Sequence, residues 1–395
     1  MGDSREDTSA PFASYLVDIY TQGILQDTVP WVTTDPNKLR LQAKKAMRED
    51  AYNYIAGGAG EGATMDANRL AFRQWKIIPR MMRPSAPRDL KVTLFGELYG
   101  TKEVGTAAAC AELNVPFIMS TSSTSTMQEV AEACGDHPRW FQLYWPTDDE
   151  ITASILSSAK TAGFKVLVVT LDTATMSWRP ADLDTAYIPF LKGQGNAVGF
   201  SDPVFRRKFA EKSDGAAPED SPLLASKYWL SEAFPGDSHP WDHLEVIKKY
   251  WDGPIVLKGI QHPDDAVLAL QHGVSGVIVS NHGGRQMDGA VGSLDMLPEI
   301  VEAVGDKMTV LFDSGVRTGA DIVKALALGA KAVLIGRPVM YGLGIAGKAG
   351  AKHVLASLLA DLEGTMGLAG IRSVRDLGQA TLKRDQWGMM TTTAI

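Results

Sequence analysis

The chain has 395 residues, of which 45% are apolar, and a formal net charge of −7. This length is enough for one large domain with a full hydrophobic core. The acidic balance argues against a nucleic-acid partner, and no apolar run reaches the length of a membrane span. The only two cysteines, Cys110 and Cys134, fit reduced thiols in an intracellular protein. The N-terminus is polar and lacks a signal-peptide core, so we expect a cytoplasmic protein. Its charge and its short apolar runs lead us to expect neither a nucleic-acid nor a membrane partner.

Residues 1–35 are expected to form an N-terminal arm, and residues 36–395 to form one β/α domain. Leu39–Ile55 has the spacing of a helix that stops at Gly57-Gly58. From Phe117 onward, short apolar runs alternate with helical stretches, which predicts a parallel sheet. The expected strands are Phe117–Ser120, Phe141–Trp145, Val166–Asp172, Ile255–Gly259, Gly276–His282, Thr309–Gly315 and Ala332–Gly336. The expected helices between them are Thr126–Ala133, Glu150–Ala162, Pro263–His272, Pro298–Val304 and Ala320–Leu328.

So many β/α units in one chain favour a closed TIM (β/α)8 barrel, although the pattern alone leaves an open sheet possible. A closed barrel needs eight strands, and the pattern supplies seven. The only candidate for the missing strand is Lys91–Leu98, which runs quickly into a predicted helix over Val104–Asn114.

The regular alternation stops over about residues 183–250, which are rich in proline, serine, aspartate and aromatic residues. A long insertion on the mouth side of a barrel is typical of a lid or a binding loop. Its aromatic residues indicate partial packing rather than a disordered decoration.

Polar side chains recur where the predicted strands end, and a buried strand needs none of them. Since the carboxyl ends of barrel strands meet at one mouth, this recurrence predicts a site there. His282 can move a proton near neutral pH and Arg285 can hold a carboxylate, which suggests an enzyme acting on a small organic acid. The strand-end residues are Ser120, Thr121, Gln142, Tyr144, Thr170, Asp172, Lys258, Ser280, His282, Asp313, Gly336 and Arg337.

The last two strand ends predict a phosphate site. Glycines 315 and 336 allow close backbone approach, and Arg317 and Arg337 add bidentate donors. Lys258 ends an apolar strand, where it either forms a Schiff base or places positive charge beside a flavin. The seven histidines and two cysteines have no metal-ligand spacing, so no metal is predicted.

Ser280-Asn281-His282-Gly283-Gly284-Arg285-Gln286 resembles the active-site signature of the FMN-dependent L-2-hydroxy-acid oxidases and dehydrogenases. The resemblance extends from about Tyr54 to the end of the last helices. Tyr54–Gly58, Trp178-Arg179-Pro180, the long insertion and Lys258–Asp265 resemble the lactate 2-monooxygenase branch of that family.

The resemblance implies a role for each of these residues. His282 would be the catalytic base and Asp172 would orient it. Arg285, Arg179 and Tyr54 would bind the substrate carboxylate, and Tyr144 the 2-oxygen. Lys258 would face the flavin and stabilise its reduced, anionic ring. Cofactor contacts would come from Ser120, Gln142, Thr170 and Ser280 toward the ring and ribityl chain, and from Asp313, Gly315, Arg317, Gly336 and Arg337 toward the ribityl and phosphate groups.

The implied reaction is oxidation of an L-2-hydroxy acid to the 2-keto acid by FMN, with oxygen as acceptor. In the monooxygenase branch, the bound product is also decarboxylated. A homo-oligomer of four or more subunits is implied as well.

In one place the sequence departs from the family. Phe95–Thr101 runs almost directly into Lys102–Gly105, where the family has its first barrel strand and a flavin-contacting loop. Roughly 20 residues are absent by this comparison, in agreement with the count of seven strands. We therefore expect a barrel whose first strand and loop are deleted, unless Lys91–Leu98 fills the gap.

Three alternatives remain open from the sequence. The first is an inactive barrel that has lost FMN binding through the deletion. The second is a flavin-barrel isomerase of phosphorylated substrates, which would not need the carboxylate-binding residues. The third is an aldolase that uses Lys258, which would leave His282 and the two phosphate-type arginines with less to do.

Overall fold

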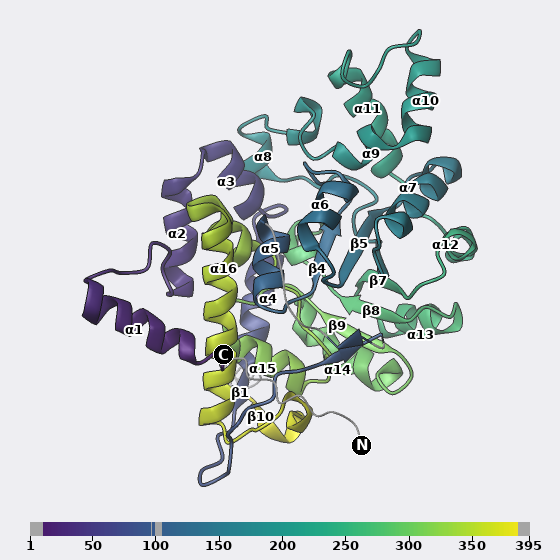
Figure 1. Cartoon of the computed structure of the whole chain (residues 1–395). Coiled ribbons are helices and arrows are strands. Elements are labelled where there is room, and N and C mark those ends of the chain that lie inside the picture. Colours follow the sequence, from purple (N-terminus) through teal and green to yellow (C-terminus); the bar gives the residue numbers. More distant parts are fainter. Residues whose placement is uncertain (1–10, 96, 99–104, 386–395) are drawn as a thin grey trace, which may run out of the picture.

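The computed structural model describes residues 11–95, 97–98 and 105–385. Its centre is a parallel sheet of six strands that follow one another in chain order, surrounded by helices (Figure 1). The strands are β4 (Phe117–Ser120), β5 (Arg139–Tyr144), β6 (Val166–Thr170), β7 (Ile255–Ile260), β8 (Gly276–Val279) and β9 (Thr309–Phe312). All six lie where the apolar runs predict them, with ends that differ by up to three residues.

The α-helices of the barrel and its insertion follow the strands. They are α6 (Met127–Cys134), α7 (Asp149–Thr161), α8 (Pro180–Leu183), α9 (Ala197–Ser201), α10 (Pro203–Lys212), α11 (Pro222–Ala233), α12 (Leu244–Tyr250), α13 (Pro263–Gln271), α14 (Ser293–Val304), α15 (Gly319–Ala327) and α16 (Arg337–Leu368). Short 3-10 turns lie at η1 (Pro189–Lys192), η2 (Trp241–His243), η3 (His282–Gly284), η4 (Val374–Asp376) and η5 (Gln379–Thr381).

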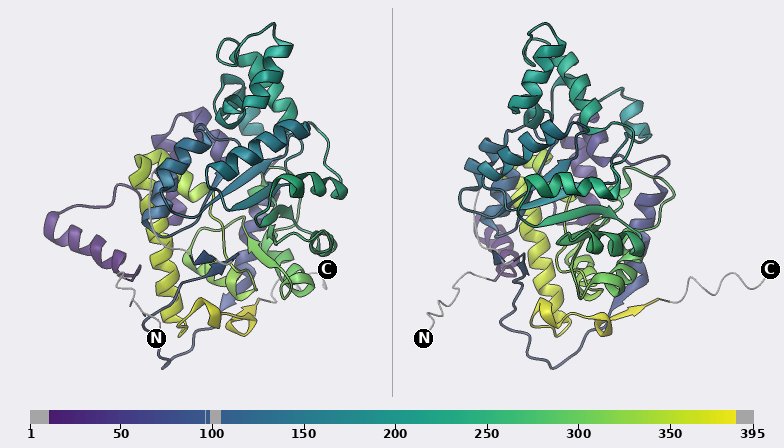
Figure 2. Two further views of the ribbon diagram at one scale, coloured as in Figure 1. Left: turned by 45° about the vertical axis from the view of Figure 1, so that its right-hand side comes forward. Right: turned by 90° about the vertical axis from the view of Figure 1, so that its right-hand side faces the viewer.

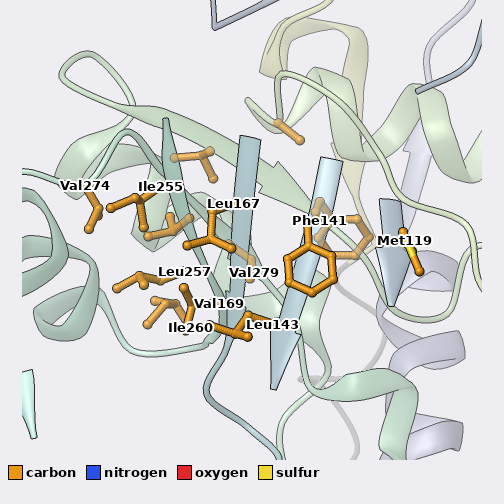
Figure 3. Packing of buried hydrophobic residues seen from close by; sticks show 14 of the residues in the cluster. Met119, Phe141, Leu143, Leu167, Val169, Ile255, Leu257, Ile260, Val274 and Val279 are labelled. Atoms are coloured by element: carbon orange, nitrogen blue, oxygen red, sulfur yellow. The ribbon is translucent and has the colours of Figure 1, made fainter. Parts of the chain in front are cut away.

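The period-two alternation along each strand divides its side chains between two cores. Met119, Phe141, Leu167, Leu257 and their equivalents point outward and pack under the helices (Figure 3). Side chains of the opposite parity fill the barrel interior, namely Trp140, Val166, Val168, Val256, Ile278 and Leu311. Both faces are therefore apolar, as expected of a parallel sheet that is covered on both sides.

The seventh predicted strand is reduced to a single β-bridge and a few backbone hydrogen bonds to β9. Val333 forms an isolated parallel bridge with Phe312, and Ala332–Gly336 otherwise has no regular strand pairing. In the described part of the chain, no strand joins this segment to β4, so the sheet runs from β4 to β9 without closing. The structure thus has the architecture of a β/α barrel with one open wall.

The suggestion that Lys91–Leu98 replaces the missing strand is wrong. Its residues form a small antiparallel pair, β2 (Thr93–Leu94) with β3 (Glu97–Leu98), rather than joining the parallel sheet. Leu94 is buried in the barrel interior, and the Phe95 ring lies 5.5 Å from that of Trp140. Local sequence favours a strand here, but the short turn folds the segment back on itself. It fills the interior of the barrel and leaves the wall open.

A second group of helices packs beside the open wall. It consists of α2 (Pro36–Ala46), α3 (Glu49–Ala56), α5 (Gly105–Glu112) and α16, which share a core that includes Leu39, Tyr52, Cys110 and Leu355. The single helix predicted over Leu39–Ile55 is in fact two, because the backbone leaves the helical conformation at Met47 and Arg48. The Met47 side chain lies against Gly344 of α16.

The remaining elements lie at the margins. Helix α1 (Ser14–Gln26) belongs to the predicted arm; its N-terminal end contacts α16, and the rest extends away from the body (Figure 1). Helix α4 (Ala63–Gln74) leads into β1 (Trp75–Ile77), which pairs with β10 (Leu382–Arg384). None of the helices in the described ranges has the length and apolar character required to cross a bilayer.

The insertion is folded rather than a disordered decoration. Helices α9, α10 and α11 project beyond the barrel and are drawn in teal at the top of both views in Figure 2. Phe205, Phe209 and Trp229 are buried among them and belong to the same hydrophobic cluster as the outer face of the sheet.

Candidate active site

Three neighbouring strands deliver the central residues of the site. Asp172 follows β6, Lys258 lies within β7, and His282 follows β8. Because the strands are parallel and paired in this order, their carboxyl ends lie side by side. The sequence prediction that these residues converge is therefore confirmed by the geometry.

His282 is held in one orientation. Its Nδ1 lies 2.8 Å from Asp172 Oδ1 and 3.0 Å from Thr173 Oγ1, and its backbone N–H donates to Ser280 Oγ. A carboxylate can only accept a hydrogen bond, so Nδ1 carries the proton and Nε2 keeps its lone pair. The His282 backbone has a φ of +55°, an uncommon conformation for a residue other than glycine. The imidazole is therefore oriented to accept a proton at Nε2.

Charged groups of both signs lie around His282. Lys258 Nζ lies 3.4 Å from Asp172 Oδ2 and 3.8 Å from Asp313 Oδ2. Burial alone would raise the pKa of Asp172, but Lys258 and then His282 outweigh this and hold that pKa well below its usual value. Burial and the Lys258 charge lower the pKa of His282, against the opposing pull of Asp172. At neutral pH the cluster thus contains a carboxylate, an ammonium group and a neutral imidazole.

The protonation of Lys258 bears on the aldolase alternative. Burial would lower the pKa of Lys258, but Asp172 and Asp313 outweigh burial and raise it. A Schiff base requires the free amine, which this environment disfavours. The lysine is instead a fixed positive charge facing the barrel mouth.

Two arginines and a tyrosine form the predicted carboxylate site. The Arg285 guanidinium lies 5.1 Å from the centre of the Tyr54 ring and donates to the carbonyl oxygen of Gly57. Arg179 donates to the Arg285 carbonyl oxygen over 2.9 Å and to Gln286. Burial, then the neighbouring Arg285, lowers the pKa of Arg179. Both arginines are half-buried, and Asp182 lies 3.9 Å from Arg179, so a bound carboxylate would use the donors that these contacts leave free.

Tyr144 completes the predicted substrate-binding set. It ends β5, and burial raises the pKa of its phenol to about 12. The side chain is therefore an uncharged hydrogen-bond donor at neutral pH.

A cavity of about 510 Å³ lies in the mouth and continues into the barrel. Its polar lining includes every predicted cofactor contact except Ser280, together with Tyr144, His282 and Arg285. The cofactor contacts that line it are Ser120, Gln142, Thr170, Lys258, Asp313, Gly315, Arg317, Gly336 and Arg337. Ser280 is fully buried and supports the backbone of His282 instead.

One side of this cavity carries a chain of hydrogen bonds across three strands. Ser120 Oγ donates to Gln142 Oε1, and Gln142 Nε2 donates to Thr170 Oγ1, over 2.8 and 2.9 Å. This chain fixes the Gln142 amide, so its orientation toward a bound ring is set before binding.

The other side holds two half-buried arginines. Arg337 donates to the carbonyl oxygens of Ile55, Gly57 and Gly283, and Arg317 donates to that of Val316. Neither forms a salt bridge with a carboxylate in the described part of the chain. Burial lowers the pKa of Arg337 to about 9, a shift that an anion beside it would reverse. This donor set, at the first turn of α16, fits a phosphate group.

The glycine at position 283 is required by this arrangement. Its φ is +65°, and a Cβ there would lie 2.7 Å from Arg337 Nη1. The turn after His282 and the cation of the predicted phosphate site are therefore in direct contact. No group of three or more possible metal ligands is gathered among the residues that the structure describes.

Comparison with known proteins agrees with this geometry. The family model for FMN-dependent dehydrogenases matches residues 43–101 and 97–384. The chain belongs to the FMN-dependent dehydrogenase family. It is therefore an FMN-dependent oxidoreductase, and the residues around the 510 Å³ cavity are those that would hold the FMN.

Individual relatives cover nearly the whole chain. An FMN-dependent alpha-hydroxy acid dehydrogenase of Penicillium citrinum is 54% identical over 389 residues, which is 94% of this chain and 96% of the relative. An L-lactate oxidase of Lysinibacillus sphaericus is 39% identical and covers 85% of this chain and 88% of its own length. A crystal structure of mandelate oxidase superposes with a TM-score of 0.73 at 32% identity, over 89% of this chain and 98% of its own. The TIM-barrel fold is thereby established.

Sequence reasoning missed three supporting groups. Thr173 contacts both Asp172 and His282, and its position next to Asp172 was the available signal. Ser314 accepts a hydrogen bond from the Gly283 N–H. Asn68 and Asn281 exchange side-chain hydrogen bonds of 2.8 Å beneath the His282 turn, and nothing in the sequence links two residues so far apart.

Proposed function

We propose that the protein oxidises an L-2-hydroxy acid to the corresponding 2-keto acid, with oxygen as the final electron acceptor. The observation that carries this proposal is the Asp172–His282 pair, with Nε2 of the imidazole left to accept a proton. Arg285, Arg179 and Tyr54 supply the binding site that a carboxylate next to the reacting carbon needs.

FMN, when bound, supplies the acceptor for the two electrons that leave the substrate. His282 accepts a proton from the hydroxy acid at Nε2, and Asp172 stabilises the imidazolium that results. Tyr144 donates its O–H to the 2-oxygen. Lys258 would lie against the cofactor ring and place a positive charge beside it, while Arg317 and Arg337 would hold the phosphate group.

The acceptor and the fate of the product are finer points of the proposal. The likeness to L-lactate oxidase favours oxygen as the acceptor. The long insertion over the mouth favours retention of the product, which decarboxylation requires. With L-lactate, a monooxygenase would release acetate, carbon dioxide and water, whereas an oxidase would release pyruvate and peroxide in equal amounts. Measuring these products separates the two reactions.

The alternative is an inactive barrel, which the open wall between β4 and Ala332–Gly336 supports. The family match is also split into two parts that meet at residues 97–101. The alignment with the Penicillium relative spans 389 residues, which exceeds 94% of 395, so that relative has residues that this chain lacks. The deletion remains a prediction.

The deciding experiment is the visible spectrum of the purified protein before and after anaerobic addition of L-lactate. A flavin band that bleaches supports the proposed reaction. A colourless protein that added FMN does not reconstitute supports the inactive barrel. The homo-oligomer and the cytoplasmic location stay predictions, to be checked by light scattering and cell fractionation.

A further inference from the structure

An unbroken row of aromatic rings connects the two tyrosines of the substrate site. The Tyr144 ring lies 5.0 Å from Phe234, Phe234 lies 6.0 Å from Phe190, and Phe190 lies 6.3 Å from Tyr54. Tyr187 adds a second edge contact to Tyr54, also at 6.3 Å. Tyr54 precedes the barrel and Tyr144 ends β5, whereas Tyr187, Phe190 and Phe234 come from the insertion. The insertion therefore covers the substrate site with aromatic side chains.

Phe234 is held in place from both sides along the chain. Two residues before it, Glu232 accepts hydrogen bonds from the Thr147 hydroxyl at 2.6 Å and the Asp148 N–H at 3.0 Å, both just after β5. Two residues after it, the Gly236 N–H donates to the Ala174 carbonyl oxygen, just after β6. Phe234, at the C-terminal end of α11, is thus fixed over Tyr144 by contacts to the barrel mouth on both sides.

Phe190 is positioned by a buried asparagine. Asn196 is fully buried and its side-chain amide donates to the Phe190 carbonyl oxygen at 2.8 Å and to Ser226 Oγ. Phe190 itself is only 7% exposed. Phe190 and Phe234 are therefore both held in fixed positions over the substrate site, as a site that selects by shape requires.

A second cavity, of about 340 Å³, lies next to Phe234. Ala233 and Pro235, the neighbours of Phe234 on either side, line it, as do His239 and Trp241 of the insertion. Tyr144, Thr170 and Asp172 line it as well, and since Tyr144 and Thr170 also line the 510 Å³ cavity, the two cavities are adjacent. Phe234 has its ring against Tyr144, a residue that lines both cavities. We infer that Phe234 separates the substrate site from this cavity and sets the size limit for the substituent on C2 of the acid.

This inference rests on the proposed function and adds a substrate class to it. If the carboxylate occupies the two arginines and the hydroxyl lies between His282 and Tyr144, the remaining substituent faces the aromatic row. Uncharged rings disfavour an ionised substituent, since burying its charge would leave it without a partner. An unbroken row leaves room for a small group. The preferred substrate is therefore a short, apolar 2-hydroxy acid such as L-lactate, rather than L-malate or L-mandelate.

The test compares the holoenzyme with the Phe234→Ala and Phe234→Leu variants on L-lactate, L-2-hydroxybutyrate, L-mandelate and L-malate. Phe200→Leu is the matched control, because Phe200 stacks on Phe205 in the outer part of the insertion. We expect the ratio of kcat/KM for L-mandelate to that for L-lactate to rise roughly tenfold or more in Phe234→Ala, mainly through KM, and less in Phe234→Leu. The control should leave the ratio unchanged.

A second readout is independent of turnover. Phenylglyoxylate, the keto acid derived from mandelate, should perturb the flavin spectrum of Phe234→Ala at a lower concentration than that of the parent protein. An unchanged ratio in both Phe234 variants, or a parent protein that prefers L-mandelate, would overturn the inference while leaving the proposed function standing. A flavin that none of the four acids reduces would overturn both.

Discussion

At the carboxyl ends of β6, β7 and β8, each charged group of the catalytic cluster has a partner of opposite charge or a hydrogen bond. Asp172, for example, contacts three of its neighbours: Thr173, Lys258 and His282. The wall between β4 and Ala332–Gly336 is built differently. In the described residues, β4 pairs with β5 alone, and the other segment pairs with β9 through one bridge.

The difference separates two properties of the barrel. Catalytic geometry depends on neighbouring strands that each bring one residue to the mouth, and β6 to β8 are intact. Enclosure of the cofactor depends on the complete ring of strands, and the cavity here is also lined by Cys110 and Leu355 of the helices outside the wall. The catalytic residues can thus keep their geometry although the barrel wall is incomplete. Each experiment below tests either the catalytic residues or the wall.

The largest effect is expected from closing the wall. Inserting the corresponding segment of the Penicillium relative between Leu98 and Gly105 should give β4 and Ala332–Gly336 a shared neighbour. We expect FMN content to rise from well below one per chain to about one, measured from the flavin absorbance after denaturation. The same segment inserted at the exposed Gly215 is the length control and should not raise it. If the parent chain already binds FMN one to one, the open wall does not limit binding.

The second largest effect is expected at the catalytic cluster, where strands β6 to β8 are intact. In the chain that binds FMN, His282→Gln should lower the rate of flavin reduction by L-lactate roughly 10²–10⁴-fold, because the amide cannot accept the proton. His262→Gln, at an exposed histidine, is the control. FMN content should be the same in all three proteins. Comparable reduction rates in the His282 variant would remove His282 from the mechanism.

Arg285→Lys should have a smaller effect. Lysine keeps the charge but loses the planar pair of donors, so kcat/KM should fall roughly 10- to 100-fold, mainly through KM. Arg207→Lys, which alters an exposed ion pair with Glu150, serves as control. A loss confined to kcat would show that Arg285 does not bind the carboxylate in the ground state.

The pH profile should follow His282. The base must be neutral to act, so kcat/KM should fall about tenfold per pH unit as pH drops below the pKa of the free enzyme. Burial and Lys258 lower that pKa, so the midpoint should lie below 6.5, the ordinary value for histidine. A midpoint above 6.5 would mean that Asp172 dominates over burial and Lys258.

The sequence predicted the catalytic cluster better than it predicted the barrel wall. Asp172, Lys258 and His282 converge because each follows a recognisable apolar run, and parallel strands end at the same mouth. Lys91–Leu98 also has a strand pattern, but a pattern does not name the partner strand. The short turn at Phe95 gave it a neighbour of its own, and the barrel interior received Leu94. Helix α2 likewise ends at Ala46, before the predicted end, and Met47 lies against Gly344, a contact that no local spacing reveals.

The smallest effect compares the two cores directly. Leu167 of β6 is fully buried between the sheet and its helices, and Leu94 is 3% exposed beside the 510 Å³ cavity. Truncating a buried leucine to alanine costs about 2–5 kcal/mol, and the cost is highest where the surroundings cannot relax. Leu167→Ala should therefore lie near the top of that range and Leu94→Ala near its bottom, as measured by urea unfolding. Equal losses would mean that the packing around Leu94 is as tight as behind β6. The segment over residues 93–98 would then replace the interior packing of a closed barrel, even though it does not pair with the wall.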